Sequence, residues 1–83
     1  MDFRTALLTV VDRTLDDELA SSLKGKRKNN PVWGILELYV RRLYFHKTGK
    51  RLSKTVDWSK LLDWLKENLP AIIQLIVSLL AVF

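Results

Sequence analysis

The last part of the chain, from Asn68 to Phe83, carries no charged side chain. These 16 residues would form a helix about 24 Å long at about 1.5 Å per residue. The hydrocarbon core of a bilayer is roughly 30 Å thick, so the segment is too short to span it comfortably. Because almost all of its side chains are apolar, we expect it to lie against lipid, against another protein or inside a helical bundle.

The residues before this segment place apolar side chains on one helical face. Trp58, Leu61 and Leu65 recur at spacings of three and four. Pro70 then marks either a kink or the first turn of a new helix, and on a continuous helix the same stripe extends beyond it. We therefore predict one docking unit, residues 55–83, bent at Pro70. Its predicted membrane- or partner-facing residues are Trp58, Leu61, Leu62, Trp64, Leu65, Leu69, Ile72, Ile73, Ile76, Leu79, Leu80 and Phe83.

The N-terminal part predicts a first helix over residues 3–23. Asp2 is placed to accept hydrogen bonds from its first N–H groups, and Gly25 to close it in a left-handed cap. Its predicted buried stripe is Leu8, Val11, Leu15 and Leu19, with Leu7 on the flank.

A second helix is predicted over residues 31–46. Asn30 followed by Pro31 is typical of a helix start, since proline has no N–H to lose there. The predicted apolar stripe is Leu36, Tyr39, Val40 and Leu43, widened by Trp33, Ile35 and Tyr44.

Two large apolar residues of this helix, Leu38 and Phe45, fall outside the stripe, which indicates contacts on more than one side. The segment is also dense in β-forming residues, so a strand over residues 38–45 is an open alternative. Gly49 is a natural terminator of the helix.

These patterns predict an all-α fold of three to four helices, at about 3–23, 31–46, 56–69 and 70–83, arranged as a small bundle or a helical hairpin. Two prolines, three glycines and 48% hydrophobic residues argue against disorder and against a turn-rich β-sandwich. A chain of 83 residues buries only about 60% of its unfolded surface, so we expect support from a bilayer or from a homo- or hetero-oligomer.

Charge divides the chain more sharply than the net +5 suggests. Residues 24–54 hold ten basic side chains against Glu37, a net +9, whereas residues 1–23 carry −3 and residues 55–83 carry −1. We therefore distinguish a basic helical region, residues 1–54, from the docking unit. Its predicted polyanion contacts are Lys24, Lys26, Arg27, Lys28, Arg41, Arg42, Lys47, Lys50, Arg51 and Lys54.

The favoured function is a small, non-enzymatic, membrane-associated structural or adaptor protein that docks by its apolar C-terminal helix. A minor component of a virion or of a larger membrane complex would suit such a chain. By the positive-inside tendency, the basic region is expected on the cytoplasmic or internal side. One alternative is a nucleic-acid-binding protein, because Trp33, Tyr39, Tyr44 and Phe45 are interleaved with the basic residues. Another is a membrane-active lysis factor or toxin.

The sequence offers little to an enzyme. It contains no cysteine, and the single histidine, His46, has no cluster of ligand or catalytic residues around it. Residues 47–50 superficially resemble a phosphate-binding loop, yet Tyr44 stands where the pattern needs glycine, and Arg51 replaces its hydroxyl residue. We expect no cofactor, no metal and no small-molecule substrate.

Overall fold

The computed structural model describes residues 1–14 and 17–83, and within them the chain forms five α-helices and one 3-10 turn but no strand. The all-α prediction is confirmed, although the predicted number of helices is too low. The strand alternative over residues 38–45 is wrong, because these residues lie inside a long helix. The elements are α1 (Phe3–Thr14), α2 (Asp17–Lys24), α3 (Pro31–Thr48), η1 (Trp58–Leu61), α4 (Leu62–Glu67) and α5 (Leu69–Val82).

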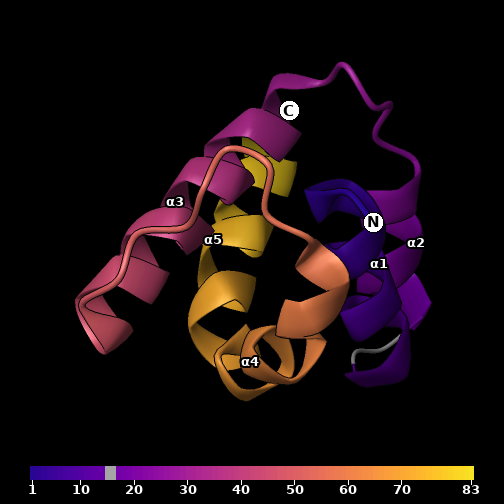
Figure 1. Cartoon of the computed structure of the whole chain (residues 1–83). Helices are drawn as coiled ribbons and strands as arrows, with labels where there is room; N and C mark the ends of the chain where they lie inside the picture. The colour runs from indigo at the N-terminus through magenta and orange to yellow at the C-terminus, as the bar shows by residue number, and fades with distance from the viewer. Residues whose placement is uncertain (15–16) are drawn as a thin grey trace.

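The helices form two packed groups around one core. α5 packs on α3, while α1 packs on α2, η1 and α4 (Figure 1). The connector between α3 and η1 runs back along α3, and the end of α5 lies close to the loop between α2 and α3 (Figure 1). In that loop, the Lys26 ammonium group donates a hydrogen bond to the carbonyl oxygen of Phe83.

The predicted first helix is two helices. Asp2 caps α1 as expected, because its carboxylate accepts a hydrogen bond from the Thr5 N–H at 2.8 Å. α2 is tied back to α1 by a salt bridge of 2.6 Å between Lys24 and Asp12. The left-handed cap at Gly25 is wrong, since Gly49 is the glycine with positive φ among the described residues.

The predicted buried stripe of this segment is also displaced. Of its members, Val11 is buried, Leu8 and Leu19 are half-buried, and Leu15 lies outside the described residues. The buried face centres instead on Leu7. A reason for the shift is that the Phe3 ring packs edge-on against Trp58, with 5.0 Å between ring centroids, which turns the Phe3 side of α1 toward η1. The buried residues of α1 are Phe3, Ala6, Leu7, Val10 and Val11.

Both predicted ends of α3 are confirmed. The side chain of Asn30 accepts a hydrogen bond from the Val32 N–H at 2.9 Å, with Pro31 in the first turn. At the other end Gly49 adopts φ 74°, and its N–H donates to the Phe45 carbonyl at 2.8 Å. This left-handed cap lets the chain reverse and run back along the helix. The buried residues of α3 are Val32, Trp33, Leu36 and Val40.

The C-terminal part does not form one gently bent helix. The Trp58–Glu67 and Leu69–Val82 segments meet at 92°, so the chain bends beside Pro70 as predicted, but the predicted stripe does not continue along one helix. The predicted helix over 56–69 is the 3-10 turn η1 followed by α4, and the predicted helix over 70–83 is α5. The amide of the buried Asn68 donates to the Trp64 carbonyl at 2.8 Å and closes α4. Pro70 then takes a first-turn position in α5, where its missing N–H costs nothing.

The hydrophobic core draws on both the basic region and the predicted docking unit. α5 contributes Leu69, Ile72 and Ile76, which are at most 3% exposed. Since α3 packs directly on α5, the inward faces of these two helices cover each other. The outward faces of the two helices are what remains for contact with other molecules.

Candidate docking surface

The structure turns most of the predicted docking residues inward. Trp58, Leu65, Leu69, Ile72 and Ile76 are buried. The partly buried ones that pack on the core are Leu61, Leu62, Trp64, Ile73, Leu79 and Leu80. Phe83 is 42% exposed. The docking stripe seen in the sequence therefore serves mainly to hold the protein's own helices together in this structure.

No single helix among the described residues is long and apolar enough to cross a membrane. The Trp58–Glu67 and Leu69–Val82 segments pass that test together, by length and composition, but they are sharply bent with respect to each other. The outward side of α5 is uncharged and exposes Gln74, Ser78, Val77 and Val82.

The predicted polyanion contacts in residues 24–28 form a first cluster, and some of them already make contacts within the protein. Lys24 is paired with Asp12, and Lys26 donates to the end of α5. The Lys26 carbonyl accepts hydrogen bonds from the Arg4 guanidinium and the Trp33 indole, both at 3.2 Å. In this loop Arg27 and Lys28 are exposed.

The predicted polyanion contacts in residues 41–54 form a second cluster, which lies beside the largest exposed apolar side chains of α3. We define the outer face of α3 as Ile35, Leu38, Arg42, Phe45 and His46, all of which are exposed. Leu38 is 51% and Phe45 42% exposed. Neither of these two residues was among the predicted docking residues. Their position outside the apolar stripe of the helix was the signal that could have identified them.

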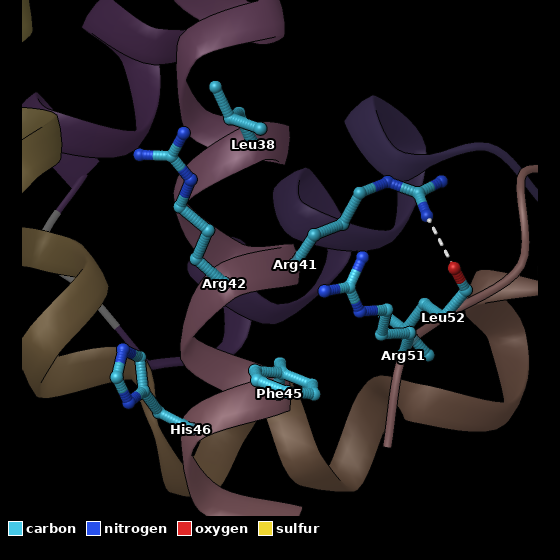
Figure 2. A pocket seen from close by; sticks show the side chains of 7 residues that line it. All are labelled: Leu38, Arg41, Arg42, Phe45, His46, Arg51 and Leu52. Carbon is cyan, nitrogen blue, oxygen red and sulfur yellow. Dashed lines mark hydrogen bonds between the residues drawn. The ribbon is translucent and has the colours of Figure 1, made fainter. Parts of the chain in front are cut away.

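A hollow of about 350 Å³ opens between α3 and the connector that follows it (Figure 2). None of the described residues that line it is acidic. In Figure 2, Arg42 extends on one side of the α3 ribbon and Arg51 on the other, with Leu38 and Phe45 along the helix between them. The lining residues are Leu38, Arg41, Arg42, Phe45, His46, Arg51 and Leu52.

Arg41 fixes the wall of this hollow. Its Nε donates to Glu37, four residues earlier in the helix, at 3.1 Å. Its Nη1 donates to the carbonyls of Leu52 at 3.3 Å and Ser53 at 2.9 Å. The guanidinium also lies 5.5 Å from the centre of the Trp58 ring. One side chain thus anchors the connector to α3.

The other two arginines are arranged differently. Arg51 lies over the Phe45 ring, with its guanidinium carbon 5.2 Å from the ring centroid. Arg42 is exposed on the outer face. Within the part of the chain that the structure describes, neither guanidinium has a hydrogen-bond acceptor or a carboxylate partner. Their N–H groups are therefore available to an external anion.

The aromatic side chains proposed for base stacking are mostly occupied. Trp33 is 6% exposed and lies under the Arg4 guanidinium, 5.0 Å from it. Tyr44 packs edge-on against Trp64 with ring centroids 5.1 Å apart. Tyr39 is half-buried, which leaves Phe45 as the exposed aromatic ring of the basic region.

Shifted pKa values lie away from this surface. Hydrogen bonds from Thr5 lower the pKa of Asp2, and hydrogen bonds from Ser59 lower the pKa of Asp57, which caps η1. The described residues contain no group of three or more side chains able to hold a metal ion. The chemistry of the outer face is thus that of fixed positive charge beside exposed apolar surface.

Searches for relatives found no matching family model, no matching curated protein and no matching solved structure.

Proposed function

We propose that this is a non-enzymatic, membrane-associated protein that docks on an anionic lipid surface through the outer face of α3. The observation that supports this proposal is the exposure of Leu38 and Phe45 between Arg42 and Arg51. A helix lying in the headgroup region needs this combination, with apolar side chains to enter the acyl boundary and cations to meet phosphates.

The expected affinity for an anionic membrane is modest. Completing the burial of Leu38 and Phe45, which are about half-exposed, contributes about 1 kcal/mol each. Each nearby basic residue adds about 1 kcal/mol at an anionic surface. With four such residues, Arg42, Lys47, Lys50 and Arg51, the total is about 6 kcal/mol, which corresponds to reversible binding between millimolar and micromolar.

Insertion of α5, which the sequence favours, is a second mode of attachment. It would withdraw Ile72 and Ile76 from the core and leave the inward face of α3 without its partner. Docking through α3 leaves the core intact, so we favour it. In either mode the basic region faces the lipid headgroups, and the cytoplasmic or internal side stays the predicted location.

Nucleic-acid binding is the other candidate, because the unpartnered guanidiniums of Arg42 and Arg51 would also contact phosphates. The burial of Trp33 and the packing of Tyr44 on Trp64 count against it, since these rings are not free to stack on bases.

One pair of variants separates these possibilities. Leu38 and Val77 are 51% and 52% exposed, the first on α3 and the second on α5. A glutamate at either position leaves the core untouched. We expect Leu38→Glu to weaken sedimentation with vesicles containing phosphatidylglycerol about tenfold or more, because it replaces an apolar anchor by a repelled charge, and Val77→Glu to change it less than about threefold.

The opposite ranking would show that α5 is the attachment helix. Failure of the wild-type chain to bind anionic vesicles, together with tight, salt-sensitive binding to a single-stranded oligonucleotide, would contradict membrane docking and favour the nucleic-acid candidate. Circular dichroism on both variants verifies that each is folded.

A further inference from the structure

The hollow beside α3 has an unbalanced charge. Arg41, Arg42 and Arg51 all line it, and among the residues that the structure describes, the carboxylate paired with them is that of Glu37, which contacts Arg41. Two positive charges, those of Arg42 and Arg51, are left without a partner among the described residues. An anion carrying two negative charges would balance them.

Two of the three guanidiniums are held in place before any ligand arrives, whereas that of Arg42 is exposed. Arg41 is fixed by its three hydrogen bonds, and Arg51 rests on the Phe45 ring. A guanidinium whose position is already restricted loses less freedom when it binds an anion, and its planar fork suits two phosphate oxygens at once. Figure 2 shows Arg42 and Arg51 on the two flanks of the helix, with Leu38 and Phe45 along it and Leu52 on the connector.

We propose that this hollow binds the phosphate of an anionic phospholipid and selects a phosphomonoester headgroup over a phosphodiester. The inference rests on the proposed membrane docking and adds a lipid preference to it. A phosphomonoester carries about −1.5 to −2 at neutral pH and offers three acceptor oxygens, whereas a phosphodiester headgroup carries a single charge.

The apolar part of the lining decides between a lipid and a free phosphate. Leu38, Phe45 and Leu52 line the hollow together with the arginines. A lipid brings acyl chain to these side chains as its phosphate reaches the guanidiniums, whereas inorganic phosphate or a small phosphate ester gains nothing from them. The occupant is therefore a phospholipid at a membrane surface.

The test compares two sets of phosphatidylcholine vesicles, one containing phosphatidic acid and the other phosphatidylglycerol, adjusted to the same surface potential. The full chain is sedimented with each at neutral pH. We expect binding to phosphatidic acid to be about tenfold tighter, as bidentate, charge-assisted hydrogen bonds would give. Arg42→Gln and Arg51→Gln should reduce this ratio to below about threefold.

Lys54→Gln is the matched control, because it removes one exposed positive charge from the same connector but does not line the hollow. It should weaken binding to both lipids and keep their ratio. Equal binding of the wild-type chain to the two vesicles would overturn the lipid preference while leaving membrane docking in place, and a loss of the ratio in Lys54→Gln would overturn the assignment to the arginines.

Binding to neither vesicle would contradict both proposals. A third arm titrates glycerol 3-phosphate against the vesicle-bound protein. We expect no displacement at concentrations a hundred times the vesicle lipid, and displacement at equal concentration would overturn the assignment to a lipid.

Discussion

α5 and the outer face of α3 exchange the roles that their compositions suggest. α5 has no charged residue, yet its side chains Leu69, Ile72 and Ile76 are buried against the rest of the chain. α3 is rich in cations, yet Leu38 and Phe45 protrude from it. Apolar content thus indicates where burial is available, whereas the surface left for a partner is decided by which faces the fold has already covered.

Shortening one side chain on each helix tests this contrast between a buried α5 face and an exposed α3 face most directly. Ile72→Ala should lower the free energy of unfolding by about 2–5 kcal/mol, because it removes buried volume from the core. Leu38→Ala should change it by less than about 0.5 kcal/mol, as for exposed positions in general. Urea denaturation measures both, and similar losses for the two variants would contradict the assignment of core and surface.

The two neighbouring arginines of α3 offer a second contrast. Arg41→Gln should cost about 1–3 kcal/mol, because it breaks charge-assisted hydrogen bonds to Glu37 and to two connector carbonyls. Hydrogen exchange should quicken in residues 52–56. Arg42→Gln should leave stability and exchange unchanged while weakening vesicle binding. A loss of vesicle binding without faster exchange in Arg41→Gln would mean that Arg41 contacts lipid directly.

Two glycines, one inside α3 and one at its C-terminal cap, should respond to alanine with opposite changes in stability. Gly49→Ala should destabilise the protein by about 1 kcal/mol, since φ 74° suits glycine. Gly34→Ala should stabilise it by about 0.5–1 kcal/mol, because Gly34 is an exposed helical position with no atom near its added methyl group. Thermal denaturation distinguishes the two signs, and vesicle binding per folded molecule should stay constant in Gly34→Ala.

The smallest expected effect is a pH dependence from the two capping carboxylates. Hydrogen bonds in the folded state lower the pKa of Asp2 and of Asp57 below the ordinary value of 3.8. The stability that each contributes is therefore present above that value and lost as the pH falls below it. Asp2→Asn and Asp57→Asn should flatten the stability profile below about pH 4, measured by urea denaturation at each pH.

The predictable parts of this fold are the local ones. The caps at Asp2, Asn30 and Gly49 depend on hydrogen bonds within a few residues, so the sequence pattern indicated them correctly. A bend at Pro70 was predicted, but its sharpness and the interruption of the apolar stripe were not, because projecting a stripe on a continuous helix keeps its phase whether or not the axis turns. The first turn of a new helix at Pro70 was the alternative that the structure confirms.

The candidate site depended on information that a single helix does not contain. The basic residues 41–54 were identified from composition alone, but their separate roles were not. Arg41 becomes an anchor because the connector returns along α3, while Arg42, its neighbour in sequence, extends on the other side of the α3 ribbon (Figure 2). Leu38 and Phe45 are exposed because α5 covers only the inward face of the helix.

Phe45 makes two separate contacts through two parts of one residue. Its carbonyl accepts the N–H of Gly49 and closes the helix, whereas its ring lies under the guanidinium of Arg51. A side-chain substitution at this position leaves the backbone acceptor in place. Phe45→Ala therefore keeps the turn at Gly49, and with it the reversal of the chain, but removes the ring that restricts the Arg51 guanidinium. Arg51 then becomes a freely moving cation.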